Sequence, residues 1–381
     1  MAAKKRGHGE GSIFQRGNGR WTAAITVGTN ADGKRIRKWV SGKTKKEVTD
    51  ELTKLQGQKL NGTLVDSGRM TVGELIDKWL ETSSRPNTEP NTHARYEGIA
   101  RLHVKPAVGS IKLSKFNPMH VQTMLSTMEA ANVGERTRGH VYAVLRRALN
   151  VGLRWGLVVR NVCDAVDPPK QKRAEIVTLL EDQVLSLISA AEGTRWHALF
   201  VVALATGLRQ GELFALKWID IDLENGVLSV RHSLEELKGK LRLKEPKSKS
   251  GRRQVTLPAG AIAALRSHKA IQAAEGLESS ELVFCAAEGG FLRKSNFERR
   301  VWNKFRDKAK IPDTITFHDL RHTSATILLG AGVHPKIVQE RLGHSSIQLT
   351  MDTYSHILPT MQQDAATKLD HIGRVNESPK P

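Results

Sequence analysis

The 381-residue chain carries 59 lysine and arginine residues against 39 acidic ones, which gives a net charge of +20 and a pI of about 10.0. This excess of positive charge indicates a polyanionic partner, most simply nucleic acid. With 39% hydrophobic residues the chain can bury real cores, so it is not a disordered tail, and its length suits two or three domains.

The cysteines and the N-terminal residues exclude other classes. Cys163 and Cys285 are the only cysteines and lie far apart, so we expect no disulfide framework and a reducing, cytoplasmic setting. The opening MAAKKRGHGEGS has no apolar run after its basic residues and therefore predicts no signal peptide. No stretch of about 18 apolar residues occurs, so we expect no membrane association.

Residues 1–62 form a small basic unit with 14 lysine and arginine residues against 5 acidic ones. Alternating side chains and turn residues predict three strands, and a capping box predicts a helix that Thr44 begins with Glu47 three residues on. These four elements are Ser12–Arg16, Arg20–Val27, Lys34–Val40 and Thr44–Leu60.

A three-stranded sheet can enter a DNA major groove, and the charge excess of this unit favours that role. The alternative is that the charges only solvate a small sheet. The candidate DNA-binding residues are Arg16, Arg20, Arg35, Arg37 and Lys38.

After a polar linker at Asn61–Arg69, residues 70–165 predict a bundle of four helices. We expect a loop at Thr82–Pro90, and we expect Lys105-Pro106 to close the second helix. Tyr142 continues an apolar stripe, which indicates a core position. The four predicted helices are Thr71–Glu81, Thr92–Val104, Met119–Ala130 and Gly134–Trp155.

Asn161–Arg173 contains two prolines and a basic run, and we interpret it as an interdomain linker. Residues 175–370 then predict an α+β domain dominated by helices, followed by a tail at 371–381. Met361–His371 suggests a short helix. The predicted strands are Val227–His232, Leu241–Lys244, Arg253–Leu257 and Leu282–Phe284.

Four short motifs in this last domain combine into a phosphate-handling set. ATGLRQGEL supplies Arg209, HDLRH supplies His318 and Arg321, a Leu-Gly-His triplet supplies His344, and Tyr354 follows ten residues later. Two guanidinium groups can grip the non-bridging oxygens of a phosphodiester. A tyrosine can attack the phosphorus covalently, with His318 as candidate base and His344 as candidate hydrogen-bond donor.

In this order and spacing the motifs resemble the tyrosine recombinases, the phage and mobile-element integrases. The resemblance implies a multidomain, mainly α fold: an arm-type DNA-binding domain with a three-stranded sheet and a helix, a core-binding (SAM-like) helical bundle, and an α+β catalytic domain. It also implies a general-acid lysine in a basic turn, which we place at Lys249, with Lys247 as the near rival. We expect Glu212 and Asp319 to orient the arginines. We interpret His322 as a structural histidine, with a supporting role behind the site residues as the alternative.

The family resemblance implies a site-specific recombinase that integrates or excises a phage or mobile element through a 3′-phosphotyrosine. The expected partners are double-stranded DNA with core and arm sites, a homotetramer on that DNA, an excisionase and a host DNA-bending factor, all in a bacterial cytoplasm. No ATP-binding loop or metal-ligand cluster occurs, so we expect no cofactor and no metal. The alternatives are a topoisomerase with the same chemistry and a non-catalytic DNA-binding protein of the same fold.

Overall fold

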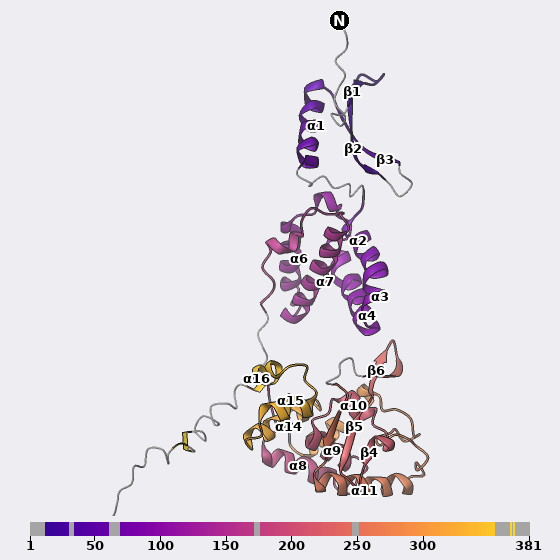
Figure 1. The fold of residues 1–381 in the computed structure, drawn as a ribbon, viewed down its shortest axis with the longest axis vertical. Helices are drawn as coiled ribbons and strands as arrows, with labels where there is room; N and C mark the ends of the chain where they lie inside the picture. The colour runs from indigo at the N-terminus through magenta and orange to yellow at the C-terminus, as the bar shows by residue number, and fades with distance from the viewer. Residues whose placement is uncertain are drawn as a thin grey trace, which may run out of the picture. The chain divides into compact units, whose positions relative to one another are not determined.

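The computed structural model describes residues 12–29, 34–60, 69–170, 176–245 and 251–354, together with residues 366, 367 and 369. The chain divides into two compact units, Met1–Arg173 and Ala174–Pro381. Helices dominate both units, and the sheets are small, as the sequence predicts (Figure 1). None of the helices within the described ranges is long and apolar enough to cross a membrane.

The first unit begins with an antiparallel sheet in the order β1-β2-β3, packed against one helix (Figure 1). Ala23 and Ile25 of the central strand bury against Val48 and Leu52 of that helix. The predicted capping box is present, because Thr44 Oγ1 accepts from the Glu47 amide at 3.2 Å and the Glu47 carboxylate accepts from the Thr44 amide at 3.3 Å. The elements are β1 (Ser12–Gln15), β2 (Trp21–Thr29), β3 (Arg35–Gly42) and α1 (Lys45–Leu60).

The helical bundle follows, and in two places its helices run further than the sequence predicts. The expected loop at Thr82–Pro90 is wrong, because the chain stays helical to Asn87; Lys105-Pro106 likewise does not end the second helix, which continues to Val108. In both cases a five-residue π-helical segment ends two residues before the proline (Pro86 or Pro106). A wider turn avoids the clash between a proline ring and the preceding turn.

Tyr142 belongs to the core of the bundle, as predicted. Tyr142 is buried, and its hydroxyl donates to the Cys163 carbonyl at 2.9 Å and the Val166 carbonyl at 3.1 Å. The start of the segment predicted as a linker therefore packs onto the bundle. The elements are α2 (Val72–Trp79), η1 (Leu80–Ser84), α3 (Arg85–Asn87), α4 (Pro90–Ile99), η2 (Ala100–Val104), α5 (Lys105–Val108), η3 (Leu113–Lys115), α6 (Pro118–Ala130), α7 (Glu135–Arg154) and η4 (Val162–Ala165).

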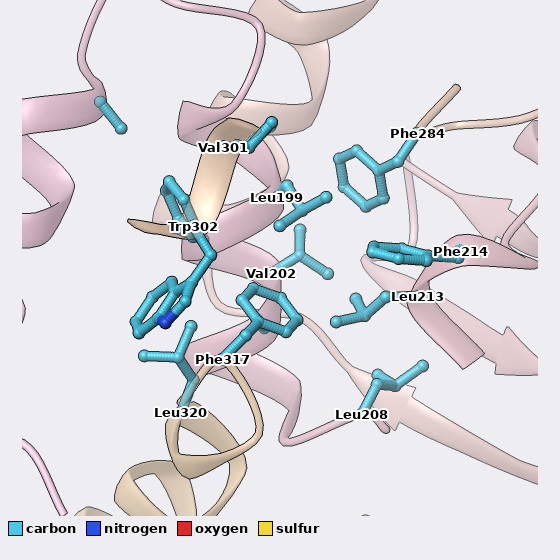
Figure 2. Close-up of a cluster of buried hydrophobic side chains, with 14 of the residues drawn as sticks. Leu199, Val202, Leu208, Leu213, Phe214, Phe284, Val301, Trp302, Phe317 and Leu320 are labelled. Atoms are coloured by element: carbon cyan, nitrogen blue, oxygen red, sulfur yellow. The ribbon is translucent and has the colours of Figure 1, made fainter. Parts of the chain in front are cut away.

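The second unit is built around an apolar core that holds its helices together. Figure 2 shows Phe317, which immediately precedes the HDLRH motif, beside Trp302, with Leu320 of the motif close by. Phe214, which follows the ATGLRQGEL motif, contacts Phe317 across this core at a ring-centroid distance of 6.5 Å. The core therefore fixes two of the motifs relative to each other.

The sheets of this unit are a three-stranded sheet in the order β4-β5-β8 and a separate hairpin, β6-β7. The sequence did not predict β6, and Leu282–Phe284 is not a strand, since Leu282 makes only an isolated bridge with Lys217. The strands are β4 (Ile221–Asp222), β5 (Val227–Val230), β6 (Ser233–Leu237), β7 (Lys240–Lys244) and β8 (Arg253–Thr256).

The helices of the second unit carry most of the motif residues. Of the predicted helix Met361–His371, the structure describes only residues 366, 367 and 369. The helices are α8 (Glu181–Ala191), α9 (His197–Thr206), α10 (Gln210–Phe214), η5 (Trp218–Asp220), α11 (Ala259–Ala274), α12 (Lys294–Phe297), η7 (Glu298–Trp302), α13 (Asn303–Lys308), α14 (Asp319–Gly330), α15 (Pro335–Leu342) and α16 (Ile347–Tyr354).

Candidate active site

Arg321 connects three of the motifs through one buried guanidinium. Its Nη1 donates to the Gly207 carbonyl at 2.6 Å, and its Nη2 donates to the Leu342 carbonyl at 2.8 Å. These carbonyls lie at the C-terminal ends of α9 and α15, where backbone acceptors lack helical partners and a cation is favourable. Burial, with the nearby charge of Arg209, lowers the pKa of Arg321 to about 9, so the side chain remains mostly cationic at neutral pH.

Gly207 allows this approach. It ends α9 in the left-handed region at φ 63°, and a Cβ there would lie 2.5 Å from the Leu342 side chain. A side chain would therefore strain the backbone and displace the buried Leu342 side chain. This requirement explains why a glycine stands two residues before Arg209.

Arg209 presents the more open guanidinium of the pair. It occupies the N-cap position of α10, its Nη1 donates to Glu212 Oε1 at 2.9 Å, and its Nη2 donates to the Gly343 carbonyl at 3.2 Å. Its side chain is 42% exposed, whereas Arg321 is only 4% exposed. Arg209 is thus held in place while keeping donors available to a bound anion.

Glu212 joins Arg209 to a third arginine, Arg253, which no sequence motif singled out. Arg253 Nη2 donates to Glu212 Oε2 at 2.9 Å, and Arg253 Nε donates to the Arg341 carbonyl at 2.7 Å. Burial alone would raise the pKa of Glu212, but Arg253 and then Arg209 hold it below its usual value. Arg253 and Glu212 are therefore a charged pair that positions Arg209.

Asp319 does not orient either arginine, contrary to the prediction. Its carboxylate accepts from the Thr316 amide at 2.7 Å and from the Thr316 hydroxyl at 2.8 Å. Asp319 stands in the first turn of α14, where a carboxylate satisfies free amides and favours the helix dipole. Its role is to fix the start of the helix that carries Arg321.

His344 is buried beside the arginines and is neutral at pH 7. Burial, with the charges of Arg321 and Arg209, lowers its pKa to about 4. Its Nδ1 lies 2.8 Å from the Thr350 hydroxyl. When that hydroxyl donates to Nδ1, the ring hydrogen is on Nε2, and the histidine can donate a hydrogen bond without carrying charge.

Tyr354 ends α16 and is 1% exposed. Burial raises the pKa of its phenol to about 12, and the charge of Arg321 opposes that rise. Among the described residues, its hydroxyl is hydrogen-bonded to His322, whose Nδ1 lies 2.9 Å away. His322 is thus the residue whose position next to the candidate nucleophile the sequence analysis missed.

His318 faces a different part of the site. With Arg209 it lines a pocket of 690 Å³ whose wall also includes Lys294 and Glu298. Its ring stands edge-on to that of His322, with the centroids 5.2 Å apart. Burial, with His322 and Arg321, lowers the pKa of His318, so the ring favours its neutral form.

The candidate general acids, Lys249 and Lys247, lie outside the described residues. The strands on either side are described: β7 ends at Lys244, and β8 begins at Arg253. Within the described ranges, no group of three histidine, cysteine or acidic side chains could hold a metal ion.

The candidate DNA-binding residues of the first unit are distributed over its sheet. Arg35 and Arg37 are exposed and, with the half-exposed Trp39, alternate along the face of β3 opposite α1. Side chains alternate along a strand, so Lys38 lies on the other face of β3 from Arg37. Arg16 lies on the same open face, with its guanidinium 5.8 Å from the Trp39 ring centroid. Arg20, in the β1–β2 connection, is also exposed.

The geometry can be compared with known proteins. Residues 178–361 match the phage integrase family, and residues 71–128 match the N-terminal SAM-like domain of phage integrases. A tyrosine recombinase XerC-like protein of Caldanaerobacter subterraneus subsp. tengcongensis is 30% identical over 95% of this chain and 98% of its own length. The chain belongs to the phage integrase family. This integrase is therefore a tyrosine recombinase, and the resemblance drawn from its motifs is confirmed.

A further relative is similar over almost the whole chain, and two solved structures share the fold. The ICEBs1 integrase of Bacillus subtilis is 24% identical over 95% of this chain and all of its own. The Tn1549 transposon integrase, solved with circular intermediate DNA, superposes with a TM-score of 0.67 at 24% identity, over 77% of this chain and 99% of its own. A lambda integrase dimer bound to a core site gives a TM-score of 0.59 at 17% identity, over 97% of each chain. The expected fold class is thereby confirmed.

Proposed function

We propose that Tyr354 of this integrase attacks a DNA phosphodiester to form a 3′-phosphotyrosine during the integration or excision of a mobile element. The observation that carries the proposal is the position of this tyrosine. The chain has three tyrosines, and Tyr142 and Tyr96 belong to the helical bundle. Tyr354 is the tyrosine that belongs to the same unit as Arg209 and Arg321, and the charge of Arg321 opposes the rise in the pKa of its phenol.

The chemistry follows from the groups around it. Arg209 and Arg321 would hold the non-bridging oxygens as negative charge builds up, and His344 would donate a further hydrogen bond. The phenol loses its proton to the candidate base His318, the new bond forms between the tyrosine oxygen and phosphorus, and the bond from phosphorus to the 5′ oxygen breaks. Lys249 would protonate that leaving oxygen.

The residues 1–62, 70–165 and 175–370 are proposed as the arm-binding, core-binding and catalytic domains, with a tail at 371–381. The proposed partner is double-stranded DNA carrying core and arm sites. On that DNA the integrase would assemble as a homotetramer. A lambda integrase tetramer on a Holliday junction, with a TM-score of 0.59 and 18% identity over 99% of each chain, supports this assembly. An excisionase and a host DNA-bending factor complete the proposed set, in a bacterial cytoplasm.

The open face of the N-terminal sheet is the proposed arm-site surface. Phe14 and Trp39 are 40% and 48% exposed and make an edge-to-face contact with ring centroids 6.0 Å apart. Arg16 lies over this pair, and Arg37 extends the same row. An aromatic pair surrounded by guanidinium groups suits a DNA backbone and the edges of its bases.

The proposed arm-site surface predicts that Arg37 and its neighbour Lys38 contribute differently to DNA binding. Arg37→Ala should weaken binding to arm-site DNA and lower the salt slope of log K by about 0.9, the effect of one phosphate contact. Lys38→Ala, its neighbour on the opposite face, should change binding much less. Fluorescence anisotropy over a salt series measures both. Equal losses in the two variants would refute the assignment of this face.

The proposed reaction can be tested with nicked DNA from the element's own junction, in the presence of a chelator. Cleavage near the nick releases a short fragment, so the covalent protein–DNA adduct accumulates and survives SDS. We expect an adduct with the wild type and none with Tyr354→Phe. Joining of two separate DNA molecules then distinguishes a recombinase from a topoisomerase. Tight binding without any adduct would favour the non-catalytic alternative.

A further inference from the structure

The proposed reaction gives no role to the hydrogen bond between His322 and Tyr354. His322 follows Arg321 directly on α14 and lies one helical turn beyond His318. Its Nδ1 is 2.9 Å from the Tyr354 hydroxyl, and the ring centroids are 5.9 Å apart. The side chain that the sequence suggested was structural therefore touches the candidate reacting atom.

Burial sets the protonation states of the two groups. Burial lowers the pKa of His322, Asp319 raises it, and Arg321 lowers it. Burial also raises the pKa of Tyr354 to about 12, so both groups are neutral at pH 7. The other titratable groups that face them are the rings of His318 and His344, both with lowered pKa values.

In the neutral tautomer that carries its ring hydrogen on Nε2, Nδ1 of His322 is unprotonated and accepts the hydrogen bond that the Tyr354 hydroxyl donates. A candidate base must lie within about 2.6–3.2 Å of the proton donor, and this pair meets that requirement before DNA is bound.

We propose that His322 accepts the proton of Tyr354 in the cleavage step. The inference rests on the function proposed above and assigns the base of that reaction to His322 instead of His318. The O–H bond of Tyr354 breaks and its proton passes to Nδ1, which makes His322 an imidazolium ion, while the phenolic oxygen forms its bond to phosphorus. In the rejoining step the same imidazolium returns the proton to the departing tyrosine oxygen.

The remaining histidines keep separate roles. His318 lines the pocket beside Arg209, where it faces the space available to a phosphate and its ring supports that of His322 edge-on. His344 is engaged at Nδ1 by Thr350. His318 and His344 therefore each contact a group other than Tyr354.

The test is single-turnover cleavage of nicked DNA as a function of pH, with His322→Asn and His322→Ala. Asparagine can still accept a hydrogen bond but takes up no proton in this range, so it separates holding the phenol from accepting its proton. We expect both variants to cleave about 100-fold more slowly, the size of a typical general-base contribution. The wild-type rate should rise with pH through the lowered pKa of His322 and then level off, whereas the rates of both variants should keep rising.

Two further measurements distinguish a base from a structural residue. Added imidazole should partly restore cleavage by His322→Ala but not by His318→Ala, the matched variant one turn away. A substrate with sulfur in place of the bridging 5′ oxygen needs no proton on its leaving group. The defect of His322→Asn should persist on that substrate, because the loss lies at the nucleophile.

The outcomes separate this inference from the proposed function. If the wild type forms no adduct, the proposed function fails. If the wild type forms the adduct and His322→Asn cleaves at the wild-type rate with an unchanged pH profile, the base assignment fails. Faster cleavage by His322→Ala would also overturn it, because the contact would then restrain Tyr354 and not activate it.

Discussion

Arg209→Lys should cleave DNA about 100- to 1000-fold more slowly than the wild type, while the catalytic unit stays folded. Losing one fixed donor to a developing anion typically costs about 3–4 kcal/mol of transition-state stabilisation. Lysine keeps the charge but not the flat, forked set of donors that can contact both Glu212 and a phosphate. The rate of adduct formation on nicked DNA measures the effect.

The matched control for this variant is Arg266→Lys. Arg266 also pairs with a glutamate, Glu224, but it lies on an exposed face of the same unit with a side chain 55% exposed. We expect this variant to cleave at the wild-type rate with unchanged DNA binding. Equal rates for Arg209→Lys and the wild type would remove Arg209 from the phosphate clamp.

Arg321→Met should abolish cleavage and also destabilise the catalytic unit. Removing the guanidinium leaves the Gly207 and Leu342 carbonyls buried without their donors. Each unsatisfied group costs about 1–3 kcal/mol, so we expect the melting temperature of this unit to fall by about 5–20 °C. Calorimetry of the full chain measures the shift, and the melting of the first unit is the internal reference.

Arg209→Met is the comparison that separates the two effects. Its side chain is 42% exposed and bonds one carbonyl at 3.2 Å, so its loss should lower the melting temperature much less. Both variants should therefore lose cleavage, but Arg321→Met should melt at a lower temperature than Arg209→Met. A wild-type melting temperature for Arg321→Met would show that its carbonyl bonds do not hold α9 and α15 together.

The sequence predicts much of this fold because its signals are local. The capping box at Thr44 and the apolar stripe through Tyr142 depend on residues within one or two turns, and both are confirmed. The helix ends that it misplaces lie at Pro86 and Pro106, where π-helical segments accommodate the rings. No local sequence pattern predicts a π-helical segment, so a helix end placed from the proline alone is wrong.

The candidate site, too, could be predicted from the sequence only in part. Motif order predicts which arginines and histidines belong together, and the structure brings Arg321 against the carbonyls of the other motifs. Two contacts of the site join residues far apart in the sequence, because Arg253 lies 41 residues from Glu212 and His322 lies 32 residues from Tyr354. Contacts at such separations depend on tertiary packing. For that reason sequence patterns predicted a structural role for His322 and none for Arg253.

The role of Tyr354 as nucleophile can be tested by locating the DNA on the trapped protein. Trypsin would release Tyr354 within the peptide 342–368, apart from Tyr96 and Tyr142. Mass spectrometry of the digested adduct should find the nucleotide on Tyr354 through its phosphate. A nucleotide on any other residue, or on none despite efficient cleavage, would contradict the proposed tyrosine chemistry.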